Sequence, residues 1–213
     1  MEADRIRLKP FVIACAGMFV LEGAAGVLIG LGWSYPMAVL GLVRVAEAGL
    51  MLWVFRRWGR GVSDLGLARD QIPAGLKQGI IWSLGFGILV LIGFGVLLLM
   101  GQNPLKLLYV RLPSDPIERF WYLLVGGIIA PVAEELFFRG VLYGYFRRWG
   151  IFLALAASSL LFVSAHSTGG FPVTQTVGGV LFALAYEFEG TLMTPITIHV
   201  SGNLALFSFS FFG

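Results

Sequence analysis

The segment from Gly126 to Gly140 reads GGIIAPVAEELFFRG, and it places charged residues inside an otherwise apolar run. The charged residues are two adjacent glutamates, Glu134 and Glu135, and one arginine, Arg139. Ionisable groups within a membrane span are costly, and they usually face the interior of a helix bundle or a water-filled cavity. The segment therefore predicts a membrane helix that carries part of a functional site.

The composition of the whole chain also indicates a membrane protein. Hydrophobic residues make up 58% of the 213 residues and charged residues 13%, whereas soluble domains have about 25% charged residues. So few charged groups cannot cover a water-facing surface, so the chain must be solvated by a lipid bilayer. The net charge of +3 comes without a concentrated basic face, which argues against nucleic-acid binding. The single cysteine, Cys15, excludes a disulfide within the chain and a cysteine-based metal site.

The fold class that we predict is all-α: a polytopic transmembrane helical bundle of about seven spans, with a polar catalytic cavity inside the membrane. Each span needs about 20 mostly apolar residues. We find no internal repeat and no separate soluble domain, so residues 1–213 are predicted to form a single integral-membrane domain, with the motif-bearing core at about 121–211. The predicted spans are 11–31, 37–55, 79–100, 121–145, 151–166, 173–189 and 192–211.

Clusters of basic residues beside the spans predict the orientation. With seven spans, three such clusters fall on one side of the membrane. Because cytoplasmic loops carry an excess of Lys and Arg, that side is predicted to be cytoplasmic and to include the N-terminus. The clusters are Arg5, Arg7 and Lys9; Arg56, Arg57 and Arg60; and Arg147 and Arg148.

Helix geometry separates the two adjacent glutamates. Glu135 and Arg139 are four residues apart and can pair along one helix face. Glu134 points about 100° away from Glu135 and has no cation on its own helix, so it is predicted to face the cavity. Pro131 should loosen the helix just before the pair, because it removes one backbone donor.

Two further predicted spans carry the two histidines of the chain. Phe162 and His166 are four residues apart in one span, and His199 and Asn203 are four apart in the last span, so each pair shares a helix face. At 1.5 Å per residue, Glu134, His166, Asn203 and His199 lie about 18, 24, 16 and 10 Å from the cytoplasmic ends of their helices. Three helices thus bring these groups to similar depths, which predicts one polar site inside the bundle.

These residue types suit the hydrolysis of a peptide bond. A glutamate and a histidine beside a water molecule can remove its proton, and a second histidine and an asparagine can hydrogen-bond the oxyanion that forms. A zinc mechanism would use Glu134, His166 and His199 as ligands, with an open position for water. We prefer the version without a metal or other cofactor, because Asn203 suits an oxyanion donor better and the H-E-x-x-H helix signature is missing.

At these residues the sequence resembles the CPBP family, which comprises the CAAX prenyl proteases and bacteriocin-processing proteins and is also called the Abi family. The resemblance covers the C-terminal half of the chain and implies a helical, glutamate-dependent intramembrane endopeptidase. The family pattern stands here without a substitution as Glu134-Glu135-x-x-x-Arg139, Phe162-x-x-x-His166 and His199-x-x-x-Asn203.

The resemblance also implies roles and partners. Glu134 and His166 would activate water, and His199 and Asn203 would stabilise the oxyanion. The substrate would be a membrane-associated protein or peptide that undergoes C-terminal or CAAX-type processing, and the short chain resembles plasma-membrane members from bacteria or archaea. The supporting residues would be Glu135, Arg139 and Phe162.

Two other function classes compete with the protease. One is a non-catalytic immunity or scaffold protein of the same fold, against which the intact motif set argues. The other is a proton-coupled transporter, in which Glu134 and the histidines would relay protons. An inverted repeat would favour that class, and the sequence has none.

Three more ionisable residues lie in the first two predicted spans. Arg44 and Glu47 are three residues apart and share a helix face, and Glu22 comes from the neighbouring span. We interpret them as an internal ion pair, with Glu22 joining it, rather than as substrate contacts.

Overall fold

The computed structural model describes residues 6–33, 35–107, 110–166 and 172–210, and over these residues the chain is helical without strands. The described part contains seven long helical units, one for each predicted span, so the predicted all-α bundle is confirmed. The units are α1 (Leu8–Gly30), α2 (Pro36–Trp58), α3 (Ile72–Leu99), a continuous unit from Pro116 to Trp149, α7 (Ile151–Ala165), α8 (Val173–Glu189) and α9 (Met193–Phe209).

The unit from Pro116 to Trp149 is not one regular helix. It begins where Asp115 accepts hydrogen bonds from the backbone N–H groups of Ile117 and Glu118, which caps α4. Wider π-helical turns then flank α5 on both sides, and such turns are frequent at functional sites. The segments are α4 (Pro116–Leu124), a π-helix (Val125–Ile129), α5 (Ala130–Glu135), a second π-helix (Leu136–Tyr143), α6 (Gly144–Phe146) and a 3₁₀ turn (Arg147–Trp149).

Length and composition separate these units into two groups. Four stretches of the described residues are long and apolar enough to cross a membrane: Leu8–Gly30, Pro36–Trp58, Val62–Leu99, which includes α3, and Pro116–Trp149. The helices α7, α8 and α9 have 15, 17 and 17 residues, or about 22–26 Å at 1.5 Å per residue. The protein is therefore a multi-pass membrane protein whose histidine-bearing helices are shorter than the others.

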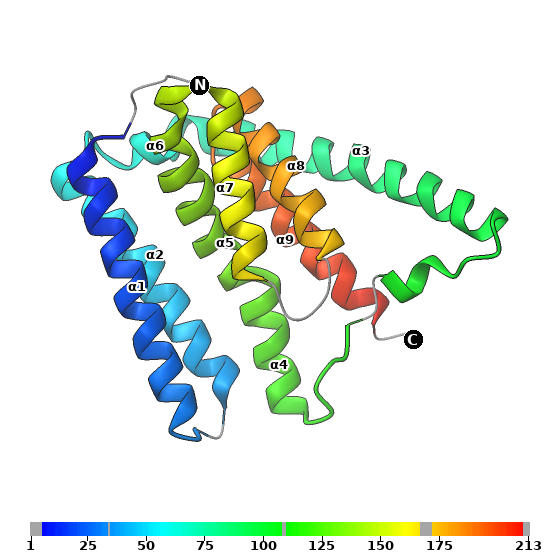
Figure 1. Ribbon diagram of the computed structural model, residues 1–213. Helices are drawn as coiled ribbons and strands as arrows, with labels where there is room; N and C mark the ends of the chain where they lie inside the picture. The colour runs from blue at the N-terminus through cyan, green and yellow to red at the C-terminus, as the bar shows by residue number, and fades with distance from the viewer. Residues whose placement is uncertain (1–5, 34, 108–109, 167–171, 211–213) are drawn as a thin grey trace.

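The helices are arranged around a central group that includes α5, α7, α8 and α9 (Figure 1). Helices α1 and α2 pack together on one flank, whereas α3 starts against α9 and then extends away from the bundle. The contact between α3 and α9 depends on glycine. A Cβ at Gly79 would lie 2.4 Å from Cβ of Thr197, so only glycine permits this approach.

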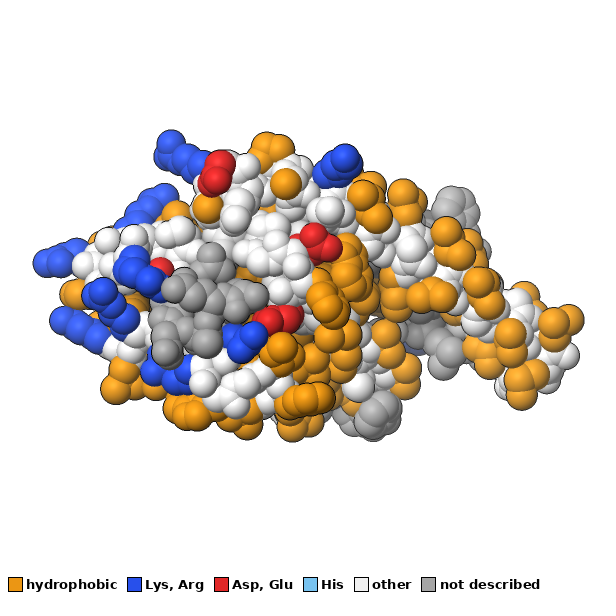
Figure 2. Space-filling view, turned by 90° about the horizontal axis from the view of Figure 1, so that it is seen from above, with side chains coloured by type: hydrophobic (Ala, Val, Ile, Leu, Met, Phe, Trp, Pro, Cys, Tyr) orange, Lys and Arg blue, Asp and Glu red, His pale blue; other side chains and the backbone are white. Residues whose placement is uncertain are grey.

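Basic side chains gather at one end of the molecule (Figure 2). Lys9, from α1, and Arg57, from α2, lie 5.6 and 5.8 Å from the ring of Trp58, and Arg148 donates a hydrogen bond to the carbonyl of Ile6. The three predicted basic clusters therefore meet at one end, although Arg5 lies outside the described residues. That this end is cytoplasmic stays a prediction.

Candidate active site

Glu134 of α5 lies between the two histidines of the chain. Its Oε2 atom is 3.6 Å from Nε2 of His166, at the end of α7, and 3.8 Å from Nε2 of His199, in α9. The side chains of Glu134 and His166 retain 14% and 28% of their exposure. The structure thus brings together three of the four predicted catalytic residues at a point that a small molecule can reach.

Hydrogen bonds orient both imidazole rings. Nδ1 of His166 bonds to the carbonyl of Phe162 at 2.8 Å, and Nδ1 of His199 bonds to Oε1 of Glu135 at 2.8 Å. Because these oxygens accept, each Nδ1 carries a proton, and Nε2 of each neutral ring is an acceptor. Three acceptor atoms therefore converge at the site, and such a point suits a donor such as water.

Glu135 and Arg139 form the predicted pair, and both side chains are fully buried. Nη1 of Arg139 donates to Oε1 of Glu135 at 2.9 Å, and Nη2 donates to the carbonyl of Gly179 at 3.0 Å. Because the same Oε1 of Glu135 also accepts from His199, the pair connects α5, α8 and α9. The two adjacent glutamates thus have different partners, as their 100° separation on a helix predicts.

Aromatic rings enclose the guanidinium group of Arg139. Its Cζ atom lies 4.5 Å from the ring centre of Phe162 and 5.2 Å from that of Phe182. Phe182 also stacks on His199, with ring centres 4.5 Å apart and an angle of 24°. Sequence reasoning identified Phe162 but missed Phe182 and the Gly179 carbonyl, because helix α8 reads as a plain apolar span.

Asn203 contacts a different part of the bundle. Its Nδ2 atom donates to the carbonyl of Gly126, in the first π-helical turn, at 2.8 Å. One of its two amide hydrogens is thus used to join α9 to the helix that carries Glu134, and the other is left for a ligand. The predicted role at the oxyanion stays a prediction.

The chemistry of Glu134, His166 and His199 matches a His₂Glu zinc set, and anchored Nδ1 atoms are usual for zinc-binding histidines. Within the described residues, however, no group of three or more His, Cys, Asp or Glu side chains is arranged to hold a metal ion. That the site works without a metal stays a prediction.

Arg44 and Glu47, on α2, lie beside this site. From the sequence alone they were interpreted as an internal ion pair and were not assigned to the site. Helix α2 packs against α5, and the charge of Arg44 acts on both Glu134 and His166. The predicted ion pair is confirmed, since Nη1 of Arg44 is 2.6 Å from Oε2 of Glu47 and 2.5 Å from Oε1 of Glu22. Spacing within one helix revealed the pair but gave no information on which other helix it faces.

Comparison with known proteins agrees with the motif pattern. Residues 116–205 match the family model described as type II CAAX prenyl endopeptidase Rce1-like. Over this segment the chain is similar to the CAAX proteases of the CPBP family. The matched segment includes Glu134, His166, His199 and Asn203 and excludes α1, α2 and α3.

Two proteins are similar to the chain, one over most of its length and the other over a shorter part. The chain is 28% identical over 206 residues to an uncharacterized 24.3 kDa protein of Escherichia coli, a match that covers 93% of this chain and 91% of that protein. It is 34% identical over 89 residues to the membrane-embedded CAAX protease MroQ of Staphylococcus aureus, a match that covers 38% of this chain and 36% of MroQ. No solved structure matches the chain.

Proposed function

We propose that this protein is an intramembrane endopeptidase that cleaves a peptide bond of a membrane-associated protein or peptide. The observation that carries the proposal is the position of Oε2 of Glu134, 3.6 and 3.8 Å from the Nε2 atoms of two histidines whose other nitrogens are anchored. The match to the Rce1-like family and the similarity to MroQ support a CAAX-type protease.

In the proposed reaction, Glu134 and His166 bind one water molecule and remove its proton as its oxygen attacks the scissile carbonyl. His199 and Asn203 stabilise the negative charge that develops on the carbonyl oxygen. In this role both ring nitrogens of His199 carry a proton, and Nδ1 donates to Oε1 of Glu135 while Nε2 donates to the oxyanion. The proton then passes to the leaving amine, and the peptide bond breaks without a covalent enzyme intermediate.

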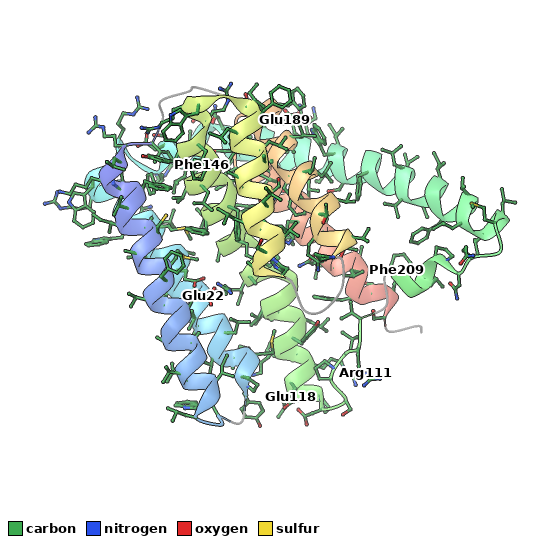
Figure 3. The ribbon with its side chains drawn as sticks, in the orientation of Figure 1. Glu22, Arg111, Glu118, Phe146, Glu189 and Phe209 are labelled. Atoms are coloured by element: carbon green, nitrogen blue, oxygen red, sulfur yellow. The ribbon has the colours of Figure 1, made fainter. Side chains whose placement is uncertain are left out.

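The first experiment compares cleavage of a library of lipid-tethered peptides by the wild-type protein and by Glu134→Gln. A matched control is Glu118→Gln, because Glu118 lies at the outer end of α4, the first segment of the same helical unit (Figure 3). We expect cleavage by the wild type and the control but not by Glu134→Gln. Equal cleavage by all three proteins would refute the assignment.

A chelator distinguishes the metal-free mechanism from the zinc alternative. We expect cleavage by the wild type to be unchanged when the chelator is present, because the proposed steps use only side chains and water. Loss of cleavage that added zinc restores would refute the metal-free mechanism and leave the protease assignment intact.

A further inference from the structure

The ionic cluster of Glu22, Arg44 and Glu47 has no part in the proposed reaction, yet it lies within the membrane helices. One nitrogen of Arg44, Nη1, donates to both carboxylates. The two carboxylates differ in exposure: the side chain of Glu47 is completely buried, whereas that of Glu22 is 44% exposed. Glu22 lies about midway along α1 (Figure 3). An exposed side chain changes its orientation more easily than a buried one, so Glu22 is the more readily displaced of the two carboxylates.

The cluster is close to the candidate active site. Helix α2, which carries Arg44 and Glu47, packs against α5, which carries Glu134, so these charges are near enough to interact with Glu134, and Arg44 is near enough to interact with His166. Arg44 itself is 15% exposed, which is similar to the 14% of Glu134. A peptide bound at Glu134 therefore has a cation from α2 within reach.

Arg44 has more donors than its two bonds use. A guanidinium group has five N–H donors, and both bonds come from Nη1. The Nε atom of Arg44 is buried without a partner among the described residues, and so is Oε1 of Glu47. Nη2 of Arg44 makes neither of the two bonds, and because a guanidinium group can hold a carboxylate through two parallel bonds, Nη1 and Nη2 together suit a carboxylate ligand.

We propose that Arg44 is a binding site for a carboxylate of the substrate, and that Glu22 occupies this site in the free protein. The inference rests on the proposed protease function, whose substrate it describes. Exchange of Glu22 for a substrate carboxylate leaves the number of negative charges on Arg44 unchanged. Glu22 can turn away from Arg44 because its side chain is half exposed, whereas buried Glu47 stays in place and holds Arg44 in position.

The test measures binding rather than cleavage. The probes are N-palmitoylated apolar pentapeptides with N-methylated peptide bonds that resist hydrolysis. One probe ends in a free carboxylate, the second in an amide, and the third in an amide with one internal glutamate. Comparison of the last two with the first distinguishes a chain-terminal carboxylate from a side-chain carboxylate as the natural ligand.

Three full-length proteins in lipid nanodiscs are compared: the wild type, Glu22→Gln, and the double variant Arg44→Gln/Glu47→Gln. The double variant removes the charges of Arg44 and Glu47 together, so neither is left unpaired in the bundle. Its affinity for the plain amide probe reports whether the site remains folded.

We expect the wild type to bind at least one carboxylate probe about 10-fold or more tightly than the plain amide, which is the effect of one charge-assisted hydrogen bond. Glu22→Gln should bind that probe more tightly still, and the double variant should bind acid and amide equally. The proposal would be overturned if the wild type bound the carboxylate probes and the plain amide equally. It would also be overturned if the double variant still preferred a carboxylate probe. If the wild type prefers a carboxylate probe but cleaves no peptide, the protease function is refuted and the carboxylate site is not.

Discussion

Two arginines lie inside the helix bundle, and their surroundings differ. Arg139 is completely buried, donates to Glu135 and to a backbone carbonyl, and contacts phenylalanine rings. Arg44 is partly exposed and shares one nitrogen between a buried carboxylate and a half-exposed one. Both arginines are paired with a glutamate on their own helix, so the sequence pattern alone makes them look alike.

The difference indicates what each arginine can do. Every contact of Arg139 that we describe is with a buried group, and a ligand could reach it only if the bundle opened. Arg44 can exchange Glu22 for a ligand without disturbing Glu47. The Glu135–Arg139 pair therefore stabilises the site, and we infer that Arg44 binds the substrate that enters it.

The largest expected effect is on catalysis, at His166. His166→Ala should reduce the rate of cleavage by about 10²- to 10⁴-fold, because general-base assistance of this kind is lost. The melting temperature should change little, because the ring is partly exposed and its Nδ1 hydrogen bond is to the backbone of its own helix. The control is Ser164→Ala, an exposed position two residues earlier in α7. If His166→Ala cleaves as fast as Ser164→Ala, His166 has no part in the mechanism.

The next largest effect is on stability, at Glu135. Glu135→Gln should lower the free energy of unfolding by about 3–5 kcal/mol, because it leaves the buried charge of Arg139 uncompensated. Unfolding in mixed micelles measures this quantity, with Glu118→Gln expected to stay within about 0.5 kcal/mol of the wild type. If Glu135→Gln is as stable as the control, the Glu135–Arg139 pair does not hold the bundle together.

A smaller effect is expected at Phe182. Phe182→Leu should cost about 0.5–1.5 kcal/mol of stability, because stacking on His199 and contact with Arg139 are lost. It should also lower kcat more than it raises KM, since His199 loses its orientation. Phe188→Leu is the control, because Phe188 is near the end of the same helix and 72% exposed. Equal kcat values for the two variants would show that the stacking does not position His199.

The smallest effect is expected at Glu22. Glu22→Gln should change the free energy of unfolding by less than about 1 kcal/mol, as is usual for exposed ion pairs. Glu47→Gln should destabilise the protein more, because Glu47 is the completely buried partner of Arg44. The same unfolding assay compares the two. A larger loss for Glu22→Gln would mean that Glu22 is a structural residue and not an exchangeable one.

The sequence was sufficient to predict the helices and the separation of Glu134 and Glu135 onto different partners. Apolar length identifies spans, and the 3.6-residue period separates adjacent side chains on one helix. The predicted span 121–145 nevertheless misses the ends of the unit at Pro116 and Trp149, because the Asp115 cap and the π-helical turns depend on local bonding.

Relations between helices were harder to predict. That Arg44 approaches Glu134, or that Phe182 stacks on His199, depends on how helices far apart in sequence pack together, and a single sequence does not encode this in a periodic pattern. The similar depths did predict that His166 and His199 lie near Glu134, because the depth of a residue follows from its position along its helix. Depth does not determine the direction in which a side chain points, and Asn203 in fact donates to Gly126.

The central claim is that Glu134 activates water and does not itself attack the peptide. A single turnover in ¹⁸O-labelled water, with protein in excess over a lipid-tethered peptide that the library screen identifies, tests this directly. Mass spectrometry then locates the label. The proposed mechanism predicts one ¹⁸O atom in the new carboxyl group of the product and none in Glu134. Label in the carboxylate of Glu134 would contradict the claim, because it would show that this residue had formed a covalent intermediate.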